Sequence, residues 1–178
     1  MTDEEVRKAP YGELLEEIVR LRQRIADLEA ALSKGGGKTM NIALLRPIGG
    51  GRVSQWFGGN REWYEQYGLP GHNGLDYAVK AGTPVIAAHD GELCIPSPDL
   101  TGYGVHVIVR AEGYYTLYAH LSSVAREVGP VAAGEIIGYT GNTGNSTGPH
   151  LHFGLRLTRA GYQSQPYHGW VDPWVFRG

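Results

Sequence analysis

The sequence of 178 residues contains a single cysteine, Cys94, so no disulfide can form within the chain. We expect Cys94 to fill a small apolar space, because Leu93 and Ile95 flank it. No apolar run approaches the roughly 20 residues that a membrane-spanning helix needs. The formal net charge is only −2, which provides no strong field for nucleic acid or anionic lipid. The sequence therefore predicts no nucleic-acid partner and no membrane insertion.

The start of the chain also lacks the pattern of a secretory signal. Residues 1–5 are acidic, and no apolar stretch follows them that could serve as the central region of a signal peptide. We therefore expect a soluble protein that is made in the cytoplasm.

Glycine, in contrast, is abundant at 27 residues, and aromatic side chains make up 10% of the sequence. This composition favours a turn-rich β protein over a helical one. The predicted strands cover residues 83–88, 105–110, 114–119 and 135–139, and turn signals separate them. One stretch, residues 61–67, has a helical pattern. The sequence thus predicts a mainly β fold whose antiparallel strands form a sandwich or an open barrel.

The N-terminal part of the chain has a different pattern. Apolar residues alternate spacings of four and three in a heptad seam that comprises Leu14, Ile18, Leu21, Ile25, Leu28 and Leu32. Isoleucine at a and leucine at d favour a parallel two-stranded coiled coil. The alternative is a single amphipathic helix that lies on the downstream domain. We predict a helix over residues 1–34, a homodimer through residues 14–32, a glycine-rich linker over 35–40 and the main domain over 41–178.

Two short motifs carry the chemistry. His72 and Asp76 are four residues apart, and Gly74 between them would leave a strand face clear for a metal ion. His150 and His152 are two apart and share a strand face. The glycine-rich loop 142–149 before them would bring this pair to the site. A lone histidine is usually a surface or core residue. The joint presence of both motifs predicts a catalytic zinc site, in which three protein ligands leave a position for water.

A further histidine, His120, lies in the stretch Tyr118-Ala119-His120-Leu121. With these motifs the sequence resembles the lysostaphin/LytM-type family of zinc endopeptidases, which cut peptidoglycan cross-bridges. The resemblance runs from about Arg52 to Leu157, and residues 171–173 are similar to the closing segment of the family. The matching stretches, all in the family's order, are residues 71–76, 81–88, 90–91, 102–104, 118–121, 134–138, 140–144 and 148–153.

The resemblance assigns roles that spacing alone leaves open. It implies that His72, Asp76 and His152 bind one Zn²⁺ per chain, and that His120 and His150 act in catalysis. Zinc lowers the pKa of water and polarises the scissile carbonyl. His150 is then expected to be the general base for the attacking water. His120 is expected either to donate to the oxyanion or to steady that water.

The function implied is hydrolysis of peptide cross-links in bacterial peptidoglycan. The alternative is a relative without activity, since some LytM-type domains carry coiled coils and activate partner amidases. An intact metal set favours the enzyme. A wall-cutting enzyme without a signal peptide indicates a phage or prophage lysin, released by a separate membrane-permeabilising protein or carried in a virion. A truncated or re-engineered secreted protein would have the same sequence pattern. Links between glycines and links of D-alanine to a diamino acid both occur as substrates within the family.

The other histidines receive structural interpretations. His89 precedes the turn Asp90-Gly91 and is expected to be exposed. His106 lies opposite three valines on its strand, from where it could equally line the cleft. His168 belongs to an aromatic C-terminal tail that we expect to pack against the sheet. Finally, Tyr64 or Tyr67, shortly before the first metal motif, is a candidate to reach the cleft and assist the oxyanion.

Overall fold

A computed structural model describes residues 41–177 of the chain. The predicted N-terminal helix, its coiled coil and homodimer through residues 14–32, and the linker up to residue 40 lie outside the described residues. They stay predictions.

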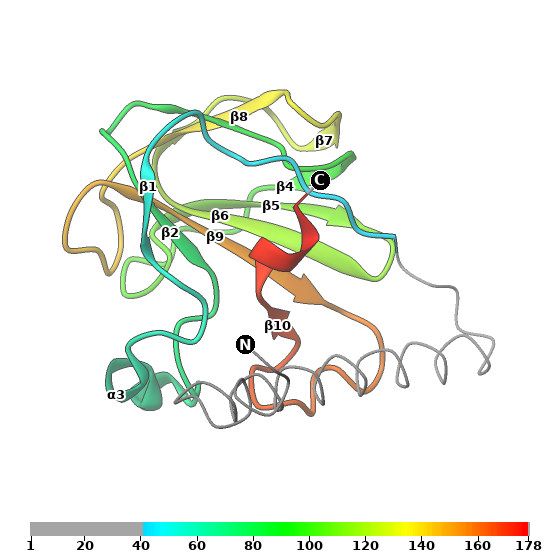
Figure 1. Cartoon of the computed structure of the whole chain (residues 1–178). Coiled ribbons are helices and arrows are strands. Elements are labelled where there is room, and N and C mark those ends of the chain that lie inside the picture. Colours follow the sequence, from blue (N-terminus) through cyan, green and yellow to red (C-terminus); the bar gives the residue numbers. More distant parts are fainter. Residues whose placement is uncertain (1–40, 178) are drawn as a thin grey trace, which may run out of the picture. The chain divides into compact units, whose positions relative to one another are not determined.

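The described part is built almost entirely from antiparallel strands, which join into one ten-stranded sheet (Figure 1). The hydrogen-bonded path runs β1-β2-β9-β6-β5-β4-β7, while β10 pairs with β9 and β8 pairs with both β3 and β6. The mainly β, antiparallel prediction is confirmed. The strands are β1 Arg52–Gln55, β2 Leu75–Ala78, β3 Pro84–Ile86, β4 Gly91–Cys94, β5 Val105–Ala111, β6 Tyr114–Val124, β7 Gly129–Val131, β8 Ile136–Thr140, β9 His150–Leu157 and β10 Trp170–Val171.

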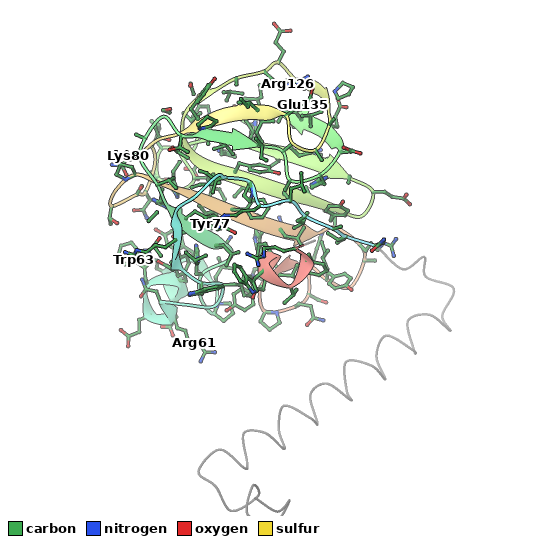
Figure 2. The ribbon with its side chains drawn as sticks, turned by 45° about the horizontal axis from the view of Figure 1, so that its top comes forward. Arg61, Trp63, Tyr77, Lys80, Arg126 and Glu135 are labelled. Carbon is green, nitrogen blue, oxygen red and sulfur yellow. The ribbon has the colours of Figure 1, made fainter. Side chains whose placement is uncertain are left out.

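Helical structure is confined to short segments in the described residues. The predicted helical stretch 61–67 forms α3 (Arg61–Tyr64) followed by the 3-10 helix η1 (Glu65–Tyr67), and η2 (Pro173–Phe176) lies near the C-terminus. Figure 2 shows Trp63 of α3 at the opposite end of the domain from Arg126 and Glu135, which form an ion pair of 2.7 Å. Within residues 41–177 no helix is long and apolar enough to cross a membrane.

Strand β6 changes partners at a bulge centred on His120. Residues Tyr114–Ala119 pair with β9, whereas Leu121 and the residues beyond it pair with β8. On the other side, the register with β5 shifts between Val105 and Val107, so that one residue of β5 faces two of β6. His120 has a positive φ of 59°. Because a bulge bends its strand and redirects side chains, β6 can serve both halves of the sheet while His120 leaves the normal alternation.

The two faces of the central strands bury different sets of residues. On β9, Leu151, Phe153 and Leu155 are fully buried in the main core, where Phe153 packs on Tyr118 with ring centroids 5.3 Å apart. The opposite face carries a smaller cluster of Ile108, Leu117 and Ala119, with Cys94, Tyr103, Tyr115 and Trp170 packed against it. Alternation along β9 puts His150 and His152 on this second face. The predicted apolar role of Cys94 is confirmed.

The prediction that His89 is exposed is wrong. Its side chain is only 5% exposed, and its Nε2 lies 3.0 Å from Thr116 Oγ1. Thr116 in turn donates to the Tyr118 hydroxyl at 2.9 Å, and the backbone N–H of Ala88 donates to the same hydroxyl at 2.8 Å. An imidazole can be buried where its nitrogens are hydrogen-bonded. The partner of His89 Nε2 is 27 residues away in the sequence, so the turn signal next to His89 could not predict that the side chain is buried.

The aromatic tail packs as expected. Trp174 meets Trp56 edge-on with ring centroids 4.8 Å apart, and Tyr167 lies 4.5 Å from Phe57. Trp170 covers Gly154 on the second face of the sheet, where an added Cβ would lie 2.7 Å from the indole. His168 is exposed.

Two loops that flank the β6 bulge, around residues 102–105 and 143–145, are joined by hydrogen bonds. Thr143 Oγ1 accepts the backbone N–H of Val105 at 3.0 Å and donates to Leu121 O at 2.8 Å. The backbone N–H of Asn145 donates to Gly102 O at 2.8 Å. Gly104 lies between these contacts with φ 63°, and a Cβ there would overlap Thr143. A glycine is therefore required at this position both for its φ and for the close approach of the loops.

We predict that Gly104→Ala destabilises the domain by at least about 3 kcal/mol, since strain at a positive φ and overpacking add together. The matched control is Gly82→Ala, because Gly82 has a similar φ of 80° but no neighbour within 4 Å of its added Cβ. The control is expected to cost only about 1–2 kcal/mol. Denaturant unfolding of both variants measures the difference, and equal losses would show that the loops are not closely packed.

Candidate active site

The pairing of β2 with β9 creates the first half of the site. Asp76 lies directly opposite His152 in this antiparallel pair. Directly opposed side chains on one face are close neighbours, and Asp76 Oδ1 lies 2.9 Å from His152 Nδ1. Both residues are buried, with exposed fractions of 9% and 4%.

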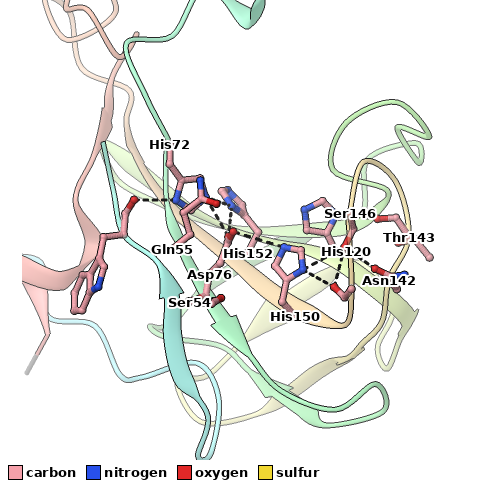
Figure 3. Close-up of polar contacts among 12 residues, drawn as sticks. Ser54, Gln55, His72, Asp76, His120, Asn142, Thr143, Ser146, His150 and His152 are labelled. Carbon is pink, nitrogen blue, oxygen red and sulfur yellow. Dashed lines mark hydrogen bonds and ion pairs between the residues drawn. The ribbon is translucent and has the colours of Figure 1, made fainter. Parts of the chain in front are cut away.

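His72 joins the pair from a loop, not from a strand. The expectation that His72 and Asp76 share a strand face is wrong, since β2 begins only at Leu75. Backbone hydrogen bonds of 2.8 Å to Gly58 and Gly59 hold the loop in place. His72 Nδ1–H donates to Trp56 O at 3.1 Å, which leaves Nε2 unprotonated and directed at Asp76 Oδ1, 3.1 Å away, and at His152 Nδ1, 2.9 Å away (Figure 3).

Gly74 makes room for an imidazole. We expected this glycine to leave space for the metal ion, but an added Cβ would lie 2.7 Å from Cε1 and 2.9 Å from Nε2 of His152. The ring of His152 therefore lies over the glycine. Its Nε2 is buried with no hydrogen-bond partner in the described residues.

The donor set fits a zinc ion. Zinc lies about 2.0–2.1 Å from nitrogen and oxygen ligands, which puts tetrahedral ligands about 3.3–3.4 Å apart. The three ligand atoms here are separated by 2.9–3.1 Å. A proton on Nε2 of His152 leaves its Nδ1 lone pair facing the same point as Nε2 of His72 and Oδ1 of Asp76. Converging lone pairs repel one another unless a cation lies between them.

The protonation states agree with a cation site. Burial opposes ionisation of Asp76, but the close contacts of its carboxylate with the ring nitrogens of His152 and His72 outweigh it and hold the carboxyl pKa well below its usual range. Burial also lowers the pKa of His152, although Asp76 opposes this shift, so the imidazole is neutral near pH 7. One carboxylate and two neutral imidazoles are typical ligands of catalytic zinc.

His120 and His150 lie next to this set and are oriented by main-chain carbonyls. His120 Nδ1–H donates to Thr143 O at 2.8 Å, and His150 Nδ1–H donates to Gly148 O at 2.8 Å. The two ring centroids are 4.6 Å apart. His150 Nε2 lies 3.8 Å from Asp76 Oδ2 (Figure 3). Each Nε2 thus keeps a lone pair on the side toward the three ligands or the cleft, and can accept a proton.

Burial and the neighbouring His152 lower the pKa of His120 to about 4. The loop 142–149 supplies a further contact to His150, because Ser146 Oγ lies 3.2 Å from its Nδ1 and donates to Asn142 Oδ1 at 2.6 Å. The four histidines and the aspartate that the sequence singled out are therefore brought together.

A cleft of about 310 Å³ opens in front of the site. Both candidate tyrosines, Tyr64 and Tyr67, line it. His106 does not, and its Nδ1–H donates to Gly104 O at 2.9 Å. The lining residues of the cleft are Trp63, Tyr64, Tyr67, Leu69, Asn73, Asp99, Thr101, Gly102, Tyr103, His120, Asn145 and His152.

The sequence analysis did not predict some of the residues that line the cleft. Tyr103 was considered only as part of a glycine turn, yet its ring lies 5.5 Å from that of His152 and its hydroxyl accepts Asn73 Nδ2–H at 2.6 Å. An aromatic residue between two glycines was the available signal. Asp99 and Asn145 carried no signal beyond turn propensity.

Comparisons with known proteins agree with this geometry. The model of Peptidase family M23 matches residues 70–166. The DD-carboxypeptidase/endopeptidase Mpg of Neisseria meningitidis is 49% identical over 87 residues, which cover 48% of this chain and 20% of that protein. The chain therefore spans about a fifth of the length of this curated relative.

Solved structures show the same fold. A zinc-containing peptidase from Vibrio cholerae has a TM-score of 0.57 at 29% identity, covering 64% of this chain and 36% of that one. The catalytic domain of the antimicrobial peptidase lysostaphin from Staphylococcus simulans has a TM-score of 0.53 at 29% identity, covering 76% of this chain and 92% of that one. The predicted resemblance to lysostaphin/LytM-type enzymes is confirmed, and the chain belongs to Peptidase family M23.

Proposed function

We propose that the protein is a zinc-dependent endopeptidase that hydrolyses peptide cross-links of bacterial peptidoglycan. The observation that carries this proposal is the convergence of His72 Nε2, Asp76 Oδ1 and His152 Nδ1 within 2.9–3.1 Å at the end of a cleft. The name of another relative supports this substrate, since the peptidoglycan DD-endopeptidase ShyA of Vibrio cholerae is 41% identical over 85 residues.

In this proposal His72, Asp76 and His152 hold one zinc ion. When bound, zinc would polarise the scissile carbonyl and lower the pKa of the attacking water. Trp56 O fixes the tautomer of His72, and Gly74 gives the ring of His152 its place. Both contacts fix the orientation of a histidine that would bind the zinc ion.

His150 is the general base in the proposed mechanism. Its Nδ1 proton is held by Gly148 O, so Nε2 takes the proton of the attacking water. The carboxylate of Asp76, 3.8 Å from Nε2, stabilises the imidazolium that forms. The proton then passes from Nε2 to the leaving amine.

His120 steadies the attacking water through its Nε2. With the proton fixed on Nδ1 by Thr143 O, a neutral His120 accepts a hydrogen bond and cannot donate one to an oxyanion. Of the two roles expected for His120, its hydrogen bonding thus favours the second, steadying the attacking water. The hydroxyl of Tyr64 is a better oxyanion donor, because burial, above all, raises its pKa and keeps its proton in place.

The alternative function, activation of a partner amidase, gains no support from the described residues. An activator needs no converging metal ligands and no oriented Nε2 lone pairs. The heptads that motivated this alternative lie outside the described part of the chain.

Lysis of isolated cell walls distinguishes the two functions. We expect the purified protein alone to clear a suspension of bacterial walls, a chelator to abolish the clearing, and added zinc to restore it. Loss of turbidity is the measurement. Clearing that needs an added amidase would instead establish the activator.

The metal ligands are tested one at a time. We predict that His72→Ala, Asp76→Ala and His152→Ala each reduce bound zinc from one ion per chain to almost none, because two remaining ligands cannot complete the site. Metal analysis of the purified, folded variants is the measurement. The exposed His168 provides the control His168→Asn, and a ligand variant with full zinc would remove that residue from the set.

The two catalytic histidines are predicted to separate activity from metal binding. His120→Ala and His150→Ala should retain zinc while kcat falls by about 10²–10⁴-fold, because one variant lacks the group that positions the attacking water and the other lacks the general base. Release of peptide from purified walls gives the rate and metal analysis gives the zinc content. Near wild-type hydrolysis by either variant would refute its assigned role.

A further inference from the structure

Asp99 is the one side chain with a fixed charge among the described residues that line the cleft. It lies in the loop between β4 and β5. The rest of the lining consists of aromatic, amide, hydroxyl and imidazole groups, together with a leucine and a glycine. No lysine or arginine of the described residues forms an ion pair with Asp99. A carboxylate without a counter-ion in a substrate cleft is a recognition element for a cation.

The carboxylate is ionised and keeps acceptor capacity. Its Oδ1 accepts the backbone N–H of Thr101 at 3.1 Å and the Thr101 hydroxyl at 3.0 Å. The hydrogen bonds from Thr101, above all the one from its hydroxyl, hold the pKa of the Asp99 carboxyl below its usual value. The backbone N–H groups of Gly102 and Tyr103 lower the pKa in the same direction, and Oδ2 lies beside Gly102. A carboxylate offers about four acceptor positions, so it can still accept from a ligand, and an asparagine oxygen could take over the contacts to Thr101.

The position of Asp99 is fixed relative to the catalytic groups. Its backbone N–H donates to Gly104 O at 3.2 Å, and Gly104 N–H donates back to Asp99 O at 2.6 Å. Gly104 packs against Thr143, whose carbonyl orients His120. The charge is therefore held in place before a substrate arrives, which lowers the entropic cost of binding.

The aromatic residues of the same cleft suit the same ligand. Trp63, Tyr64 and Tyr67 line it together with Asp99. Aromatic faces attract ammonium groups, and a carboxylate adds a charge-assisted hydrogen bond. An anionic peptide segment would meet repulsion from Asp99 and no basic lining residue.

We propose that Asp99 binds a primary ammonium group of the peptide substrate and thereby selects cross-links that carry a free amine near the scissile bond. This inference rests on the proposed function and adds its substrate class. Two sources offer the same chemistry: the side-chain amine of a diamino acid that is not engaged in a cross-link, and the free α-amine at the end of a peptide strand.

The test uses the zinc-loaded full chain and three synthetic cross-linked peptides. The first carries both free amines, the second is acetylated on the side-chain amine, and the third is acetylated on the α-amine. Wild type is compared with Asp99→Asn and with the control Glu112→Gln, which removes one charge from an exposed turn away from the cleft lining. Zinc content and thermal unfolding establish that each variant is folded.

Asp99→Asn is expected to lower kcat/KM on the free-amine peptide about tenfold, within the range for a hydrogen bond to a charged group in an exposed setting. The wild type should lose the same factor on one acetylated peptide, which identifies the source of the ammonium. On that peptide Asp99→Asn should cause no further loss. Glu112→Gln should match the wild type throughout.

Two results overturn the inference without touching the proposed function. One is an unchanged kcat/KM for Asp99→Asn on the free-amine peptide, and the other is an equal loss on free and acetylated peptides alike. If the wild type cleaves none of the three peptides, the proposed function itself fails and the inference falls with it.

Discussion

The antiparallel register of β2 and β9 brings an aspartate opposite a histidine in a buried part of the sheet, and the rest of the site depends on that pair. Asp76 and His152 are nearly inaccessible to solvent, and the buried side chain of His72 lies against both. A buried carboxylate costs several kcal/mol unless charges or hydrogen bonds compensate it. Here the neighbouring imidazoles direct lone pairs toward the same point, so a cation is the natural compensation. Binding of the metal should consequently stabilise the fold as well as prepare the reaction.

Main-chain carbonyls control the imidazoles around that point. Three histidines each donate a hydrogen bond from Nδ1–H to a main-chain carbonyl, which leaves Nε2 available. The acceptors are Trp56 O, Thr143 O and Gly148 O. A carbonyl in a packed loop can hold a ring more firmly than a flexible side chain could. The arrangement requires the loops to be fixed, and the contact of Gly104 with Thr143 together with the bulge at His120 fixes them. Gly104 is therefore required for the orientation of His120 as well as for the packing of the loops.

Much of this architecture could be predicted from the sequence. The period of two located the main strands, and the two histidine motifs with His120 located the residues that meet at the site. Tertiary contacts decided what remained. His72 lies in a loop because its place is set by Gly58 and Gly59, and His89 is buried because its Nε2 is hydrogen-bonded to Thr116. Tyr103 enters the cleft because the loop that carries it folds toward Asn73. None of these partners is close to its residue in sequence.

In the proposed function, chemistry and selection of substrate are carried by different parts of the domain. The metal ligands are set by strand pairing and by one short loop, whereas most of the cleft wall comes from the segments around α3 and η1 and from the loop after β4. Asp99 reaches the catalytic groups only through backbone contacts of Gly104 and Thr143. A change of side chain in the wall can therefore alter which peptide binds while the ligand geometry stays the same. In the proposed enzyme, the choice of bond would consequently depend on the loops that line the cleft, and hydrolysis on the sheet together with the loop that carries His72.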